Sequence, residues 1–338
     1  MTKNQILVIL KVIVSGGLIW FLLSSIDIGA AKDRILGADT VMILCAGFFL
    51  LVQMGVGGAR WWAVMRAIET PLPWFELTKL FWIGGFFSQA LPSSVGGDPI
   101  RIYMAYKDGL PLSKAINGVM LERVVTIIGL TILVIAVQPW FVPKLNAETQ
   151  MLTLTVLAML GAGTIFGVIV LLYLDRLPEA LSKFRIVRGM NALAADSRLL
   201  FLRLKGAVLA SIFGILTHVN ISLCVFFLAM SIGVDVTWLD CMVLMPLVIL
   251  VTTLPISIAG WGVREGAMVT AFALVGVPGE GALVLSLMLG ILGIVMMIPG
   301  GGFWLIRRKA GEAMSAADAE AAVEQELENT KDASSKNV

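Results

Sequence analysis

Long apolar runs separated by short polar segments dominate this chain. A bilayer core of about 30 Å is crossed by about 20 apolar residues of helix, and six runs reach roughly that length. They lie at 6–24, 41–58, 115–138, 151–174, 207–231 and 282–306. This pattern predicts an all-α polytopic membrane protein with about six full transmembrane helices.

Two further apolar regions, 74–108 and 239–277, are each interrupted near the middle by Pro and Gly. The interruptions read "ALPSSVGGDP" and "TLPISIAGWG". Because Pro and Gly break helices, we predict that each region forms two half-helices and returns as a re-entrant hairpin. Two short helices that cross the membrane would leave the same loop parity, so the sequence keeps both arrangements open.

Two segments depart from the membrane-spanning pattern. Residues 177–204 place apolar residues near helical spacing among basic ones, which predicts an interfacial amphipathic helix; a solvated helical linker is the alternative. Residues 309–338 are rich in Ala, Glu and Ser without apolar periodicity, which predicts a disordered cytoplasmic tail. We therefore expect a membrane transport domain over 1–308, with the first apolar run retained as a helix rather than cleaved as a signal peptide.

Composition supports this class and narrows the chemistry. Hydrophobic residues make up 58% of the chain and charged residues 14%, which exceeds what a soluble domain needs for its core. Cys45, Cys224 and Cys241 lie in apolar runs at unrelated spacings, so neither a disulfide framework nor a metal site is indicated. We expect no cofactor and no nucleic-acid partner.

Basic residues are distributed unevenly between the loops. If both broken regions are hairpins, 19 of the 25 basic residues fall on one face and only Lys32, Arg34 and Lys144 on the other. The positive-inside rule then places the N- and C-termini in the cytoplasm. We expect a multi-pass protein of the plasma (cell inner) membrane.

The two broken regions also resemble each other. "LPSSVGGDPIR" aligns without a gap on "LPISIAGWGVR", so that Arg101 matches Arg264; further on, Gly109 matches Gly276 after a four-residue insertion. Three spans separate the two regions, and an odd number of crossings would invert the second copy. Such inverted repeats with broken helices are typical of transporters, although two loops rich in Gly and Pro can also match by chance.

The broken regions carry groups suited to binding an anion. Asp98 followed by Pro99 is typical of an N-cap and first helical residue, which would place a helix N-terminus inside the membrane with Arg101 beside it. Such a terminus suits a phosphate. The predicted binding residues of the two hairpins are Ser93, Ser94, Gly96, Gly97, Asp98 and Arg101, and Ser257, Gly260, Gly262, Arg264 and Glu265.

Two charged residues also lie deep inside the third span. Glu122 and Arg123 occur in "NGVMLERVV", and charges at this depth are costly and face the protein interior. They are therefore candidate substrate ligands. The alternative is structural, with Glu122 pairing with Arg101, or Arg123 with Asp98. His218 lies in the middle of a span, and interhelical hydrogen bonding and proton coupling are both open to it.

The quoted stretches "LPSSVGGDPIR", "LERVV" and "LPISIAGWGVREG" resemble the lysylphosphatidylglycerol synthase transmembrane region family over residues 5–308. The resemblance implies a domain that flips aminoacylated or glycosylated lipids. The resemblance also implies a set of functional residues, which are Gly96, Gly97, Asp98, Arg101, Glu122, Arg123, Gly260, Gly262, Arg264 and Glu265. The short polar tail leaves no room for a fused synthase domain, so the chain looks like a stand-alone member, with lysyl-lipid as cargo in doubt.

Two classes of function remain after these observations. In the first, the protein is a flippase or transporter for anionic, phosphate-bearing lipids, which binds the headgroup in a polar cavity between the hairpins. The alternative is a membrane-embedded transferase acting on a lipid phosphate; the sequence offers it no convincing catalytic residues. A small-anion channel is weaker still. Candidate protein partners are a second copy of the chain and a separate lipid-modifying enzyme.

Overall fold

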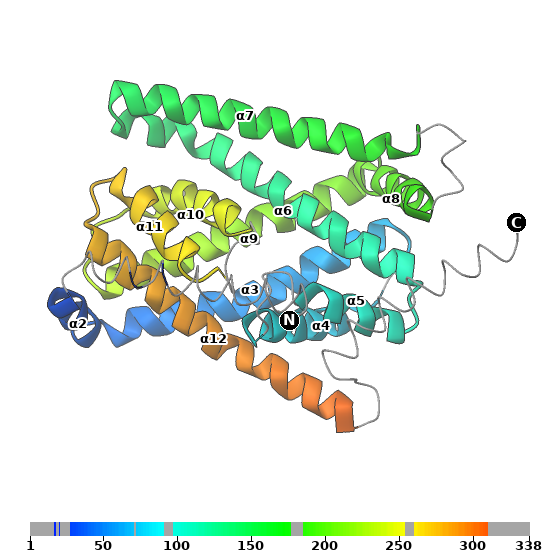
Figure 1. Cartoon of the computed structure of the whole chain (residues 1–338), viewed down its shortest axis with the longest axis horizontal. Helices are drawn as coiled ribbons and strands as arrows, with labels where there is room; N and C mark the ends of the chain where they lie inside the picture. The colour runs from blue at the N-terminus through cyan, green and yellow to red at the C-terminus, as the bar shows by residue number, and fades with distance from the viewer. Residues whose placement is uncertain are drawn as a thin grey trace, which may run out of the picture.

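The computed structural model describes residues 17, 20, 28–70, 72–90, 97–176, 185–253 and 260–309 (Figure 1). All regular secondary structure in these ranges is helical. The α-helices are α2 (Ile28–Leu36), α3 (Thr40–Ala67), α4 (Trp74–Ala90), α5 (Gly97–Lys107), α6 (Leu112–Phe141), α7 (Ala147–Leu172), α8 (Arg185–Phe201), α9 (Leu204–Ser231), α10 (Trp238–Thr252), α11 (Val263–Ala273) and α12 (Gly279–Lys309). Two 3₁₀ turns, η1 (Val142–Lys144) and η2 (Leu174–Arg176), flank α7.

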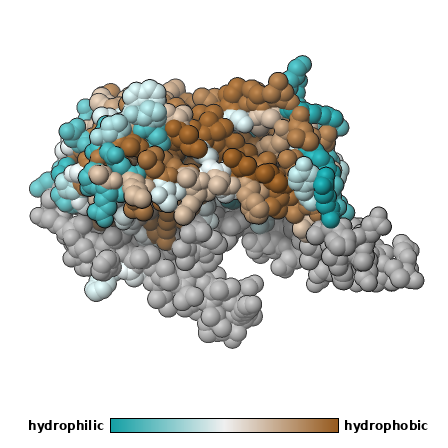
Figure 2. All heavy atoms as spheres, turned by 90° about the horizontal axis from the view of Figure 1, so that it is seen from above, coloured by the Kyte–Doolittle hydropathy of each residue, from teal (hydrophilic) through white to brown (hydrophobic). Residues whose placement is uncertain are grey.

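Five of the described helices are long and apolar enough to cross a membrane. They are α3, α6, α7, α9 and α12, and they correspond to five of the six predicted spans. The sixth prediction, 6–24, lies outside the described residues, as does the predicted tail after Lys309. Figure 2 shows an apolar band between two hydrophilic ends of the molecule, as expected for a protein whose middle faces hydrocarbon.

Each of the two interrupted regions forms a pair of short helices. Helices α4 and α5 pack against each other, and so do α10 and α11. Each region therefore contains two separate helices that pack together; the connecting residues 91–96 and 254–259 lie outside the described part, so the re-entrant hairpins stay a prediction. The aligned glycines that follow the two pairs also share one backbone conformation, because Gly109 has φ 95° and Gly276 has φ 80°, values that favour glycine.

Several helix starts follow directly from local sequence. The Asp39 carboxylate accepts hydrogen bonds from the backbone N–H groups of Val41 and Met42 at 2.7 and 3.3 Å, which caps α3. Asn146 caps α7 through the N–H of Thr149 at 2.9 Å. At α10, Thr237 and Asp240 form a reciprocal capping box. These caps fix where three of the longer apolar segments begin.

The helices cross-pack around a central pair. Helices α3 and α9 lie side by side at the centre of the molecule, α4 packs on α12, and α10 packs on α6 (Figure 1). The first short-helix pair therefore contacts the long helix that follows the second pair, and the second pair contacts the long helix that follows the first. Helix α7 is peripheral and packs mainly on α6 and α8, so most of its surface is exposed.

Helix α8 lies within the predicted amphipathic segment 177–204. It spans Arg185–Phe201, a break separates it from α9, and 177–184 lie outside the described residues. The prediction was wrong about the end of the segment, because Leu204 already belongs to α9 and is exposed. The apolar side chains of Leu193 and Leu200 are buried against the helix bundle.

Polar contacts hold α8 at this end of the bundle. The buried Asp196 carboxylate accepts hydrogen bonds from Lys114 at 2.5 Å and from Asn117 at 2.7 Å, both on α6. The Arg198 guanidinium donates two hydrogen bonds to Asp175, at 2.9 and 2.6 Å. These bonds from Arg198 hold the pKa of the Asp175 carboxyl below its ordinary value. Helix α8 is therefore tied to both α6 and the end of α7.

Candidate functional site

Arginine 101 reaches the molecular interior because the first short-helix pair is tightly closed. Helix α5 begins at Gly97, where a Cβ atom would collide with the Gly84 carbonyl and the Ser88 hydroxyl of α4. Asp98 therefore lies within the first turn of the helix and not at the N-cap, where the sequence predicted it. Its carboxylate is available to side chains instead, and Arg101 follows one turn later on the same face.

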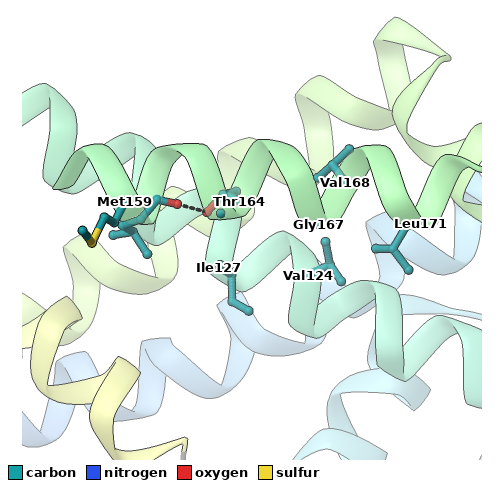
Figure 3. A pocket seen from close by; sticks show the side chains of 9 residues that line it. Val124, Ile127, Met159, Thr164, Gly167, Val168 and Leu171 are labelled. Atoms are coloured by element: carbon teal, nitrogen blue, oxygen red, sulfur yellow. Dashed lines mark hydrogen bonds between the residues drawn. The ribbon is translucent and has the colours of Figure 1, made fainter. Parts of the chain in front are cut away.

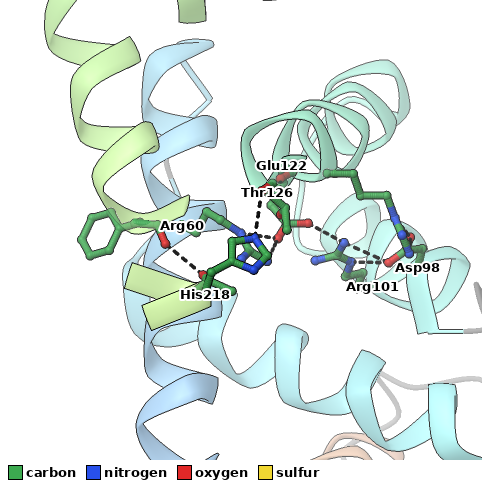
Figure 4. Close-up of polar contacts among 9 residues, drawn as sticks. Arg60, Asp98, Arg101, Glu122, Thr126 and His218 are labelled. Atoms are coloured by element: carbon green, nitrogen blue, oxygen red, sulfur yellow. Dashed lines mark hydrogen bonds and ion pairs between the residues drawn. The ribbon is translucent and has the colours of Figure 1, made fainter. Parts of the chain in front are cut away.

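Five charged side chains form one continuous network that extends from the buried Glu122 to the exposed Arg123 (Figure 4). The Glu122 carboxylate on α6 accepts hydrogen bonds from Arg60 Nε at 2.8 Å and from Arg101 Nη2 at 2.8 Å. The Asp98 carboxylate accepts from Arg101 Nε at 2.9 Å and from Arg123 Nε at 2.5 Å. Three guanidinium groups thus face two carboxylates, which leaves the network with a net charge of +1.

Both ion pairs considered from the sequence are present. Glu122 pairs with Arg101, and Arg123 pairs with Asp98. Glu122 is only 1% exposed and Arg101 only 4%. The network therefore has a structural role in joining α5 to α6, and this role is compatible with ligand binding.

Arg60 is the member that the sequence analysis missed. The predicted span 41–58 ends before Arg60, whereas α3 continues to Ala67 and buries this residue. Its Nη1 also donates a hydrogen bond to Thr217 Oγ1 on α9 at 2.6 Å. The sequence does contain an indication that Arg60 lies inside a span. The apolar stretch "WWAVM" directly follows Arg60 and extends the apolar run beyond this residue.

One nitrogen of Arg101 is left without a hydrogen bond. Within the described part of the chain, Nη1 is buried and has no partner. The guanidinium carbon lies 5.1 Å from the ring centroid of Trp61 and 5.4 Å from that of Phe81, so aromatic faces supply part of its environment. A buried donor that lacks an acceptor is costly, and an incoming anion would satisfy it.

Arg101 lines a cavity of about 380 Å³ whose largely apolar wall also carries charged side chains. The cavity also exposes atoms of Arg60, Asp98, Arg123 and Ser88, and it reaches Thr253 at the end of α10 and Met297 of α12. It therefore lies where the first helix pair approaches the second. Of the predicted binding residues, Ser93, Ser94, Gly96 and Ser257 lie outside the described residues, so their positions relative to the cavity stay predictions.

The second arginine, Arg264, is held differently. Its Nη2 donates to Glu265 Oε1 at 2.7 Å and its Nε donates to Ser286 on α12 at 3.1 Å. Glu265 also accepts the backbone N–H of Gly262 at 2.5 Å, which caps the start of α11 within the chain. The guanidinium carbon lies 4.6 Å from the Trp261 ring centroid. The second site therefore resembles the first, because its arginine also lies near the start of a short helix. It differs because the Glu265 carboxylate already accepts a hydrogen bond at the start of that helix.

Two glycines of the second site have backbone conformations that few other residues adopt. Gly260 has φ 81° and Gly262 has φ 85°, which is the left-handed region open to glycine. Both were predicted to contact a ligand. The structure gives them a backbone reason to be glycine, because they form the turn that leads into α11.

His218 forms an interhelical hydrogen bond, one of the two roles considered for it. Its Nε2 lies 2.9 Å from the backbone oxygen of Thr126 on α6, and its side chain is fully buried in α9. His218 follows Thr217, the residue that accepts the Arg60 hydrogen bond. The histidine therefore braces α6 against α9 directly behind the ion network.

Comparison with known proteins decides the family. The sequence profile described as "Lysylphosphatidylglycerol synthase TM region" matches residues 8–301. The chain belongs to this family. No curated protein matches the chain. Family membership and the five long apolar helices together make the chain a multi-pass membrane protein of a lipid-related family.

Proposed function

We propose that this family member moves an anionic, phosphate-bearing lipid between the two leaflets of the membrane. The observation that carries the proposal is Arg101, which lines the cavity beside an ion network of net positive charge and whose buried Nη1 has no acceptor among the described residues. A phosphate oxygen is a strong acceptor for such a donor. The lipid tails would stay in the bilayer while the headgroup passes through the cavity.

We further infer that α3–α6 and α9–α12 are inverted copies of one unit. Each unit has a long helix, two short helices and a second long helix, and α5 and α11 both contain 11 residues. In each unit the second long helix binds the arginine of the short-helix pair, through Glu122 in one and Ser286 in the other. The reciprocal packing of α4 on α12 and of α10 on α6 agrees with this arrangement.

The alternative of a lipid-phosphate transferase has less support. A transferase needs a nucleophile activated by a general base. Asp98, which lines the cavity, and Glu122, which belongs to the same ion network, are each engaged by two arginines, an arrangement suited to binding charge rather than to accepting a proton. The geometry therefore favours transport.

The wider assignment rests on charge distribution and on the family. We place the chain in the plasma membrane with both termini in the cytoplasm, because most basic residues fall on one predicted face. Aminoacylated or glycosylated anionic lipids are the cargo class we propose. A separate lipid-modifying enzyme would then supply the cargo, and a homo-oligomer is the assembly to test first.

Replacing arginine by lysine tests the two proposed headgroup ligands. Lysine keeps the charge but loses the planar fork that can bind two phosphate oxygens. We expect Arg101→Lys and Arg264→Lys to lower translocation of fluorescent phosphatidylglycerol in reconstituted vesicles about tenfold or more, because a hydrogen bond to a charged group contributes about 1.5–3 kcal/mol. Thermal unfolding, measured on the same samples, should show a folded protein.

Arg198→Lys is the matched control, because Arg198 also makes a two-point contact with a carboxylate but belongs to α8, outside both short-helix pairs. It should transport like the wild type. Normal transport by both lysine variants, together with alanine variants that fail only because they unfold, would make the arginines structural and remove the proposed site.

A further inference from the structure

A second, apolar hollow lies between α6 and the peripheral helix α7. It has a volume of about 440 Å³, and its lining includes Val124 and Ile127 of α6 and Met159, Gly167 and Leu171 of α7 (Figure 3). From Met159 to Leu171 the groove follows α7 for about 18 Å at 1.5 Å per residue. This length is close to half of a hydrocarbon core of about 30 Å, the depth of one lipid leaflet.

The groove exists because α7 carries small residues where it faces α6. A Cβ atom added at Gly163 or at Gly167 would meet nothing within 4 Å, so neither position is glycine for close helix packing. The one hydroxyl in the lining, that of Thr164, is already bonded to the Leu160 carbonyl at 2.8 Å and to Thr131 at 2.9 Å. The groove therefore offers apolar surface to an occupant.

The groove adjoins the Arg101 cavity through α6. Ile127 lines both, and Arg123, which lines the cavity, directly precedes Val124, which lines the groove. The Arg123 side chain is 45% exposed, so its charge is accessible where the two meet. A molecule that fills both the cavity and the groove must have an anionic head and a long apolar chain. The distance between these two parts must match about one turn of α6.

We propose that the groove between α6 and α7 binds one acyl chain of the lipid whose headgroup occupies the Arg101 cavity. The inference rests on the proposed function for the identity of the headgroup. It adds a chain-binding site that selects for lipids with a long tail, and it assigns the exposed helix α7 a role in holding the cargo. Because the chain exchanges one apolar environment for another inside the membrane, packing contacts rather than the hydrophobic effect would hold it in the groove.

Photo-crosslinking tests the proposal directly. The probe is phosphatidylglycerol with a diazirine midway along one acyl chain, added to the full-length protein in phosphatidylcholine nanodiscs. We expect cross-links within 124–127 and 159–171, displaced by excess unlabelled phosphatidylglycerol. Gly167→Leu, which fills the groove, should lower these cross-links about tenfold, the equivalent of about 1.4 kcal/mol. Arg123→Gln should also lower them, because it removes a headgroup charge.

Ala162→Leu is the matched control: Ala162 is an exposed small residue on the same helix that does not line the groove, and its cross-linking should equal that of the wild type. The proposal is overturned if a phosphatidylcholine probe labels the groove equally, if Gly167→Leu is labelled normally, or if cross-links join α7 to a second copy of the chain. If the wild type moves no lipid but the phosphatidylglycerol cross-links remain, the groove stands as a lipid site and only the proposed function fails.

Discussion

Glu122 joins three helices of this protein through one carboxylate. Its carboxylate on α6 accepts hydrogen bonds from Arg60 on α3 and from Arg101 on α5, and all three side chains are at most 6% exposed. A single charge in such surroundings would be strongly disfavoured. Shared between two guanidinium groups, the carboxylate is stabilised and fixes the relative positions of three helices.

Glu122→Gln should therefore destabilise the protein. The amide keeps the shape but removes the charge that Arg60 and Arg101 share, and breaking a buried ion pair costs about 3–5 kcal/mol. Denaturant unfolding of the purified protein measures the loss. Glu76→Gln is the control, because Glu76 forms an exposed pair with Lys79 one turn away and should change stability by less than about 1 kcal/mol. Equal losses would contradict the central role of Glu122.

The sequence revealed most of this network but not its shape. Asp98, Arg101, Glu122 and Arg123 stand out because charges inside apolar runs are rare. Arg60 did not, because a charge near the end of a run is equally typical of a loop. Hydropathy gives only the approximate length of a span, and the burial of Arg60 depends on Glu122 and Thr217, which are distant in sequence.

Among the elements, α6 and α9 make a close backbone contact at a pair of glycines. A Cβ atom at Gly129 would collide with backbone atoms of Gly214, and one at Gly214 would lie 2.7 Å from the Val125 carbonyl. Small residues at such crossings let helices pack closely in membranes. The same crossing region carries the His218 hydrogen bond to α6.

We expect Gly129→Ala to destabilise the protein by about 1–3 kcal/mol, the usual range for overpacking, because the obstructing atoms are backbone and cannot move aside. Gly293→Ala on α12 provides the comparison, since its Cβ would meet nothing within 4 Å. Thermal unfolding of both variants distinguishes them. If Gly129→Ala melts with the wild type, the two helices have more freedom to separate than the packing implies.

The pattern of apolar runs predicted which helices exist. It did not predict where they end or which of their faces pack together. The five described spans and both broken regions occur where apolar runs and Pro/Gly interruptions predicted them. The helices α3, α6 and α9 are apolar around their whole circumference, so no amphipathic stripe indicates which face is buried. The packing of α4 on α12, for example, depends on the contact of Trp82 Nε1 with the Met296 carbonyl at 2.8 Å.

At the scale of the whole molecule, the proposed inverted repeat makes a prediction about sidedness. We expect Ser94→Cys to react with a membrane-impermeant thiol reagent from the cytoplasm and Ser257→Cys from the outside, because an odd number of spans separates the two tips. The measurement is labelling in intact cells and in inverted vesicles, in a background that lacks the native cysteines.

Two exposed positions mark the faces for this experiment. Glu69, between α3 and α4, should report the cytoplasmic side, and Glu148, at the start of α7, the opposite side. Cysteines at these positions should label from opposite sides. Labelling of both tips from the same side would be incompatible with the inverted arrangement, whatever the fate of the arginine variants.

The Glu122 carboxylate that Arg60 and Arg101 share also imposes an order on the insertion of the helices into the membrane. Arg60 and Glu122 are 62 residues apart, so a ribosome delivers α3, with its arginine, well before α6 supplies the acid. A charge near the middle of a bilayer costs at least about 2.5–3.5 kcal/mol, and a long arginine side chain lowers that cost by reaching toward the interface. Helix α3 can therefore take its final position in the membrane only after α6 has been made. By then the first short-helix pair, which lies between α3 and α6 in the sequence, has also been synthesised. The complete network therefore requires that the four consecutive helices α3–α6 have assembled. A chain whose synthesis stops before Glu122 would leave the Arg60 side chain without its carboxylate partner.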